Sequence, residues 1–96
     1  MTKTIEEIKE KAMPILKKEG VKRSAIFGSV VRGEDKKGSD VDILVEPPDK
    51  MTFLGLIGLK HQLEDVLKKK VDLLTYNSVH PLLKDKIFKE QIQIYG

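Results

Sequence analysis

The sequence contains no cysteine, few aromatic residues (5%) and no long apolar run. Because cysteine is absent, a disulfide scaffold, a thiolate zinc site and a cysteine nucleophile are all excluded. No segment approaches the ~18 consecutive apolar residues that a membrane span requires. The first residues also lack the apolar stretch of a secretory signal peptide. We therefore expect a cytoplasmic protein with no membrane partner.

Arginine is also scarce, because only two of the 18 basic residues are Arg and the rest are Lys. The net charge of +3 is a weak indication of an anionic partner. A nucleic-acid surface that stacks bases needs aromatic side chains among the basic ones, and the sequence lacks this interleaving. We therefore do not expect a nucleic-acid partner.

The chain does have enough apolar material for one small core. Its 96 residues are 40% hydrophobic and 34% charged, which is typical of a folded protein rather than a disordered tail. A chain of this mass buries about 65% of its surface on folding. The sequence shows no repeat or linker, so residues 1–96 are predicted to form a single domain.

Hydrophobic spacing and turn residues predict the secondary structure. Helices are predicted over residues 4–19, 52–69 and 81–90, strands over 21–27, 41–46 and 71–76, a tight connection over 28–33 and a polar loop over 34–39. The tail 92–95 either continues the last helix or forms a short strand. The order α-β-turn-β-α-β-α predicts a small α/β domain with a mixed sheet covered by helices.

Local signals mark the helix ends. Thr4 and Glu7 fit a capping box, and Gly20 suits the position after a helix. Pro14 removes a backbone donor from the first helix, so we expect a kink there or a helix that stops and restarts. The candidates for capping the two later helices are Asp49 or Thr52 and Ser78.

Two aspartates lie at the start of the clearest strand, and one of them, Asp42, interrupts its apolar residues. Asp40 and Asp42 are two residues apart, so both carboxylates project from one face of the strand. Two like charges this close repel each other, and a divalent cation such as Mg²⁺ relieves the repulsion. Asp72 starts another β-rich segment, and if the two strands are neighbours, three carboxylates converge as in a two-metal phosphoryl-transfer site. The net charge of residues 28–46 is −2, so the acidic cluster is local.

A glycine and a serine follow the first predicted strand. Gly28 allows backbone N–H groups to approach an anion closely, and the Ser29 hydroxyl adds a donor. If Val30 begins a helical turn, its unpaired N–H groups also face the anion. A Gly-Ser pair by itself is a weak signal, because many turns contain one.

Together these residues resemble a known family. Gly28-Ser29, ten further residues and then Asp40-x-Asp42 match the G-S-x10-D-x-D signature of the DNA polymerase β-like nucleotidyltransferase superfamily. The fuller string FGS-x-x-RG…SD-x-D, with VDLL around Asp72, resembles the minimal nucleotidyltransferase branch. The resemblance covers nearly the whole chain and implies the nucleotidyltransferase fold, which is like the polymerase β palm.

The resemblance implies a role for each residue of the motif toward ATP or another nucleoside triphosphate. Gly28 and Ser29 would hold the β- and γ-phosphates. Arg32 would lie near the phosphates or tie the turn to a neighbouring carboxylate. Ser39, which precedes the acidic pair in the motif, is counted with the nucleotide-binding residues.

The same resemblance implies that Asp40 and Asp42 ligate two Mg²⁺ ions. Asp72 would complete the metal site and help to deprotonate or orient the acceptor hydroxyl. Attack on the α-phosphate would then transfer a nucleoside monophosphate and release pyrophosphate. The protein would contribute positioning and charge neutralisation.

The resemblance also implies a partner, because the usual partner of this branch is a small helical HEPN-domain protein. Such pairs often form toxin–antitoxin systems, in which the nucleotidyltransferase is the antitoxin and transfers AMP to the toxin. Two alternatives stay open: transfer to a small molecule, and a catalytically weak binding module that neutralises a partner by contact. The apolar segment 53–59 (FLGLIGL) motivates the binding module, provided that it is exposed.

The remaining polar features have structural interpretations. His61 and His80 lack the spacing of a metal-ligand pair, so no zinc site is expected. The three lysines 68–70 close a helix, where cations interact favourably with the helix dipole.

Overall fold

The computed structural model describes residues 2–28, 31 and 40–96. Its elements are α1 (Thr2–Lys18), β1 (Arg23–Phe27), β2 (Val41–Glu46), α3 (Phe53–Leu67), β3 (Val71–Thr75), the short 3₁₀ helix η1 (Tyr76–Ser78), α4 (Pro81–Glu90) and β4 (Ile92–Tyr95). The predicted order of helices and strands is confirmed, and the tail forms a strand. The predicted connection over 28–33 and loop over 34–39 lie largely outside the described residues.

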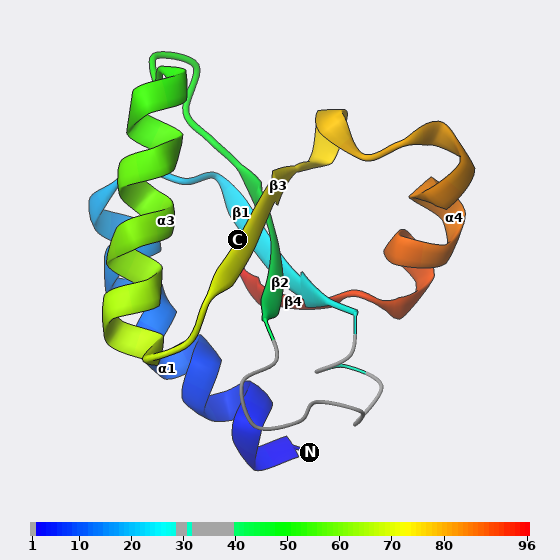
Figure 1. Ribbon diagram of the computed structural model, residues 1–96, viewed down its shortest axis with the longest axis horizontal. Coiled ribbons are helices and arrows are strands. Elements are labelled where there is room, and N and C mark those ends of the chain that lie inside the picture. The colour runs from blue at the N-terminus through cyan, green and yellow to red at the C-terminus, as the bar shows by residue number, and fades with distance from the viewer. Residues whose placement is uncertain (1, 29–30, 32–39) are drawn as a thin grey trace.

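The strands form one mixed sheet in the order β3-β2-β1-β4. Strand β1 pairs antiparallel with both β2 and β4, whereas β2 and β3 are parallel. Helix α3 makes the crossover between the two parallel strands, as parallel pairs require. Figure 1 shows α1 and α3 on one side of the sheet and α4 on the other. The mixed sheet covered by helices is therefore confirmed.

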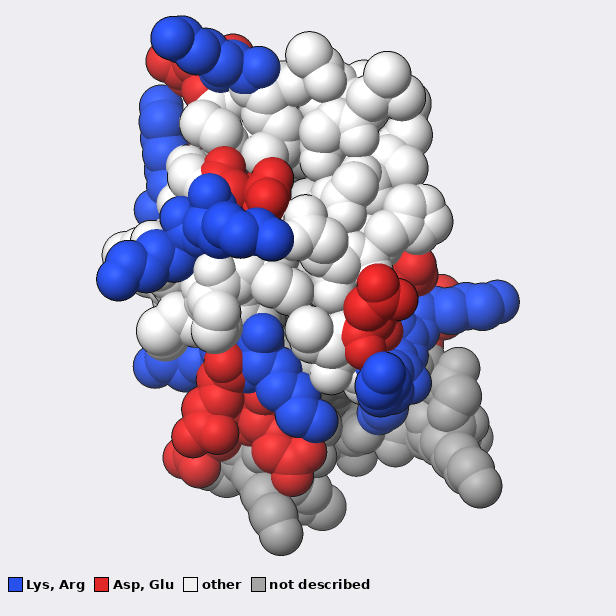
Figure 2. All heavy atoms as spheres, turned by 90° about the vertical axis from the view of Figure 1, so that its left-hand side faces the viewer, with Lys and Arg blue, Asp and Glu red and all other residues white. Residues whose placement is uncertain are grey.

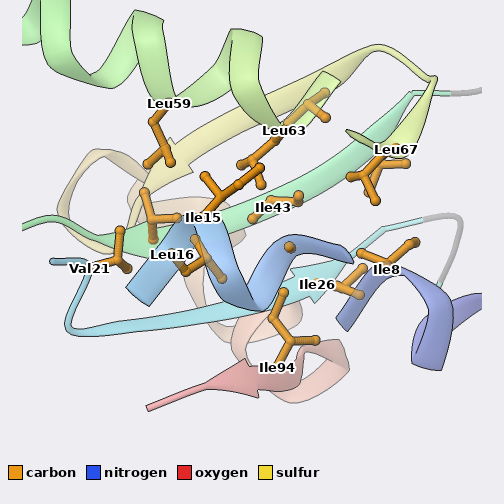
Figure 3. Packing of buried hydrophobic residues seen from close by; sticks show 14 residues of the cluster. Ile8, Ile15, Leu16, Val21, Ile26, Ile43, Leu59, Leu63, Leu67 and Ile94 are labelled. Atoms are coloured by element: carbon orange, nitrogen blue, oxygen red, sulfur yellow. The ribbon is translucent and has the colours of Figure 1, made fainter. Parts of the chain in front are cut away.

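The main core lies between the sheet and the pair α1 and α3. Figure 3 shows that Leu16 of α1 and Leu59 and Leu63 of α3 point toward Ile26 and Ile43 of the sheet. All five side chains are fully buried. Alternate residues of β2 therefore face this core, and the intervening residues, Asp42 among them, face the opposite side.

A second, smaller core lies on that opposite side. Ala25, Phe27 and Leu44 of the sheet pack there with Tyr76 and Val79, which follow β3. Helix α4 has no fully buried residue, and its partly buried Ile87 contacts this cluster. The site-bearing face of the sheet is thus covered more thinly than the face under α1 and α3.

Two predictions about the first helix, α1, were wrong. It begins at Thr2, so Thr4 lies inside the helix and is not its N-cap. It also runs through Pro14 as one helix, where a kink or a restart was expected. Pro14 is exposed, so the carbonyl that it leaves unpaired can be hydrated. A proline costs ~3 kcal/mol in a helix, whereas each buried Ile or Leu gains about 1.5–3 kcal/mol, and Ile8, Ile15 and Leu16 are buried around it.

Of the other predicted helix-end signals, those at Gly20 and Thr52 are confirmed and that at Ser78 is wrong. Gly20 has φ +75° and ends α1, with its N–H bonded to the Lys17 carbonyl at 3.2 Å. Thr52 caps α3 by accepting the Gly55 N–H at 3.1 Å. For α4 the prediction of Ser78 was wrong, because His80 is the N-cap and its Nδ1 accepts the Leu82 N–H at 3.1 Å. No helix in the described ranges is long and apolar enough to cross a membrane.

Candidate active site

Two of the predicted carboxylates lie on neighbouring strands. Asp42 of β2 and Asp72 of β3 are register partners in the parallel pair, so their side chains leave the same face of the sheet. Asp40 comes directly before β2 and lies at the same edge. Asp42 is half-buried, whereas Asp40 and Asp72 are exposed. The predicted adjacency of the two aspartate-bearing strands is therefore confirmed.

Backbone and side-chain hydrogen bonds fix this edge of the sheet. The Val41 N–H donates to the Lys70 carbonyl at 2.9 Å, which ties the start of β2 to the turn before β3. The Val71 N–H donates to a Glu64 carboxylate oxygen at 3.0 Å, which ties the same turn to α3. This hydrogen bond from the backbone is the main reason why the pKa of Glu64 lies below its ordinary value. Two parallel strands thus start side by side, each with an aspartate in its second position.

Gly28 approaches the Asp42 carboxylate more closely than any other residue type could. It follows β1, whose last residue, Phe27, is the register partner of Asp42. Gly28 has φ +81°, in the left-handed region that favours glycine. A Cβ atom built on Gly28 would collide with Oδ2 of Asp42 and lie 3.1 Å from its Cγ. The backbone of Gly28 and the Asp42 carboxylate therefore share one tightly packed corner.

The other predicted site residues, Ser29, Arg32 and Ser39, lie outside the described residues. Their assignment to nucleotide binding stays a prediction.

The donor chemistry at this edge suits Mg²⁺. The candidate ligands are carboxylates only, and Mg²⁺ prefers oxygen ligands, of which the protein usually supplies few. The backbone of Gly28, which has no Cβ, lies close to one of these carboxylates, that of Asp42. Within the described ranges, no group of three or more acidic or histidine side chains is gathered as a metal centre. The residues thus fit a site that Asp42 and Asp72 share with water and substrate oxygens.

Cationic side chains lie near the start of β2 on the other face of the sheet. A hollow of about 150 Å³ there is lined by Glu7, Lys11, Val41 and Lys69, with Ile8 and Leu67. The two lysines line this hollow together with Val41, which stands between Asp40 and Asp42 in the chain. This edge therefore combines carboxylates with nearby positive charge, which attracts polyanions such as a triphosphate.

A polar cluster that the sequence analysis did not single out lies at the other end of the sheet. Arg23 donates from Nε to Glu46 at 2.7 Å, and its guanidinium lies 4.0 Å from the ring centre of Tyr76. The Tyr76 ring also packs against Phe88 of α4, with ring centres 6.1 Å apart. Burial is the main cause that raises the pKa of Tyr76. Tyr76 therefore packs against both Arg23 and Phe88, and no sequence signal pairs it with Arg23.

Two known proteins are similar to this chain over nearly its whole length. The chain is 57% identical over 90 residues to a Methanocaldococcus jannaschii protein whose name assigns it as a protein adenylyltransferase, covering 94% of this chain and 97% of that one. It is 38% identical over 96 residues to the protein adenylyltransferase MntA of Thermococcus cleftensis, covering 95% and 96%.

Solved structures show the same fold. One described as a minimal nucleotidyltransferase superposes with a TM-score of 0.81 at 32% identity, covering 94% of this chain and 92% of that one. Another, of a variant MntA–HepT toxin–antitoxin complex, gives a TM-score of 0.74 at 25% identity, covering 91% and 71%. The sequence profile described as "Polymerase beta, Nucleotidyltransferase" matches residues 10–96. The chain therefore belongs to the polymerase β-type nucleotidyltransferase family.

Proposed function

We propose that this chain transfers AMP from ATP to a hydroxyl group of a small helical partner of the HEPN type, as the antitoxin of a toxin–antitoxin pair. The carrying observation is the register pairing of Asp42 with Asp72, with Asp40 and Gly28 at the same edge. The names of the relatives support the reaction, and the MntA–HepT complex supports the class of partner.

The proposed reaction divides the work among a few residues. Asp40 and Asp42 would hold Mg²⁺, with Asp72 completing the set, and the metal when bound would neutralise the phosphate charge. The backbone after β1, at Gly28 and Ser29, would hold the β- and γ-phosphates. Asp72 is exposed at the same edge, so it can orient the acceptor hydroxyl and accept its proton.

The chemistry of the transfer balances without a further reactant. The acceptor oxygen bonds to the α-phosphorus, the bond from that phosphorus to the bridging oxygen breaks, and pyrophosphate leaves. The proton of the hydroxyl passes to the carboxylate that orients it. Such a transfer depends mainly on positioning, which rigid neighbouring strands supply better than loops.

The decisive experiment uses α-labelled ATP, Mg²⁺ and the copurified partner. We compare the wild type with Asp42→Asn and Asp72→Asn, and we use Asp65→Asn on α3 as the matched control because Asp65 is exposed and lies outside the proposed site. Label on the partner should fall at least 100-fold in the two site variants and change less than twofold in the control. Equal labelling by all four proteins would contradict the proposed site.

Neutralisation by contact is a second candidate, favoured by one observation. Of the apolar segment 53–59, Phe53 and Leu54 are 75% and 77% exposed, whereas Leu59 is fully buried, so the exposure that the binding-module alternative needs is limited to the start of α3. Figure 2, which faces the side of α1 and α3, shows a broad uncharged surface in its upper part, at the height of the N-terminal half of α3. If the partner binds the wild type and Asp42→Asn equally and neither protein labels it, contact alone is the function.

A further inference from the structure

Two glycines of the described chain have nearly the same backbone conformation but different surroundings. Gly20 has φ +75° and Gly28 has φ +81°, so any L-residue at either position pays a similar backbone cost. A Cβ on Gly20 would rest in ordinary contact with Pro48, 3.7 Å from its Cγ. A Cβ on Gly28 would instead fall on the Asp42 carboxylate. The need for glycine at position 28 therefore has a steric component that position 20 lacks.

The carboxylate that fills this corner is one of the proposed metal ligands. Asp42 sits in the middle of the site region, with Phe27 of β1 opposite it on one side and Asp72 of β3 on the other. Its Oδ2 lies against the backbone of Gly28, in the volume that a methyl group would occupy. Relief by a shift of Asp42 would move the carboxylate itself, because its Cγ and Cβ also lie within 3.4 Å of the built atom.

We infer that Gly28 is a positioning residue for Asp42. Because Gly28 has no Cβ atom, the Asp42 carboxylate can take the position from which it binds the metal. This inference rests on the proposed function and assigns Gly28 a role besides approach to phosphate. A methyl group at position 28 displaces one ligand oxygen, and metal sites lose affinity when a ligand is held away from its geometry. The loss should therefore appear in metal binding even without nucleotide.

The test measures Mn²⁺ binding to the free protein, with Mn²⁺ as a spectroscopic substitute for Mg²⁺. Electron paramagnetic resonance counts unbound Mn²⁺ during a titration of wild type, Gly28→Ala and Gly20→Ala. We expect Gly28→Ala to weaken Mn²⁺ binding at least tenfold and Gly20→Ala to change it less than twofold. Circular dichroism and the unfolding midpoint of each variant show whether it is folded under the conditions of the titration.

A second pair of variants removes most of the backbone cost. Asn tolerates positive φ better than other residues with a Cβ, so Gly28→Asn keeps the collision while reducing the strain. Gly28→Asn should therefore lose Mn²⁺ affinity as Gly28→Ala does, and Gly20→Asn should not. In an Asp42→Asn background, Gly28→Ala should have less than a twofold further effect, because the two residues act through one contact.

The outcomes separate the inference from the proposed function. If the wild type shows no saturable Mn²⁺ binding, or if Asp42→Asn does not weaken that binding, the proposed metal-dependent function fails, and the inference fails with it. If the wild type binds but Gly28→Ala and Gly28→Asn bind equally well, Gly28 does not position Asp42. Equal losses in the variants at positions 20 and 28 would assign the effect to backbone strain and would also overturn the inference.

Discussion

Tyr76 makes the stability of this protein fall as pH rises in the alkaline range. It is 8% exposed beneath α4, and burial raises the pKa of its hydroxyl above the ordinary value of 10.0, with Glu46 acting in the same direction and Arg23 in the opposite one. The folded state holds this proton more tightly than the unfolded state does. The contribution of the protonated hydroxyl to the free energy of unfolding is therefore fully present below pH ~10 and is lost as pH rises through the pKa of the folded state. The free energy of unfolding measured in urea should therefore fall more steeply with pH above pH 10 for the wild type than for Tyr76→Phe.

The Tyr76→Phe variant keeps the ring contact with Phe88 and removes only the titrating group. Tyr95→Phe is the matched control, because Tyr95 lies in β4 and is only half-buried. The assignment of the alkaline loss of stability to Tyr76 would be contradicted if the free energy of unfolding changed with pH in the same way for the wild type and Tyr76→Phe but differently for Tyr95→Phe.

At the scale of single residues, the sequence predicts the donors of the site but not their contacts. The spacing of Asp40 and Asp42 places both on one face of a strand, and Asp72 starts a second strand. The corner shared by Gly28 and Asp42 depends on the register between β1 and β2, across a long connection whose geometry the residue pattern does not specify. The cluster of Arg23 and Tyr76 is equally non-local.

At the scale of elements, α3 carries a glycine that its own fold does not require. A Cβ on Gly58 would meet nothing within 4 Å, and Gly in a helix interior costs roughly 0.5–1 kcal/mol relative to Ala. Gly58→Ala should therefore raise the free energy of unfolding by about 0.5–1 kcal/mol. For a domain of this size, Tm rises by roughly 4–8 °C per kcal/mol.

Thermal and urea unfolding check this prediction, with Gly55→Ala as the comparison in the same helix. A Cβ on Gly55 would lie 2.9 Å from Cγ of Met51. The cost of moving that side chain therefore offsets part of the stability that Ala adds to the helix. Gly55→Ala should be less stabilising than Gly58→Ala. A destabilised Gly58→Ala would mean that the space beside Gly58 is not open.

The elements themselves could be predicted because their signals are local. The bounds predicted for β2 and α4 agree with the structure, since each element has a strong pattern and a clear stop. The errors occur where a tertiary contact overrides a local rule. Pro14 stays inside α1 because buried residues on both sides hold the helix to the sheet, and His80 takes the capping role expected of Ser78, which η1 uses in its own turn.

At the scale of the whole molecule, the aspartate edge and the exposed start of α3 are separated by the length of the sheet. Asp42 lies near the start of β2, whereas α3 begins after the end of that strand, and Figure 1 shows the start of α3 at the top and the start of β2 lower down. The two surfaces can therefore be altered independently. If both candidate functions operate, transfer belongs to the first surface and stable contact with the partner to the second.

This separation gives a prediction for Leu54→Lys. The change places a charge on the uncharged start of α3, so it should weaken binding of the partner at least tenfold in calorimetry, because a charge buried at an interface loses its hydration. Leu82→Lys is the matched control, since Leu82 of α4 is 86% exposed on another surface, and it should change the affinity less than twofold. In the labelling reaction, Leu54→Lys should raise KM for the partner and leave kcat within twofold, because the aspartates are untouched. A fall in kcat at unchanged affinity would show that the start of α3 acts on the transfer step, and would contradict two separable surfaces.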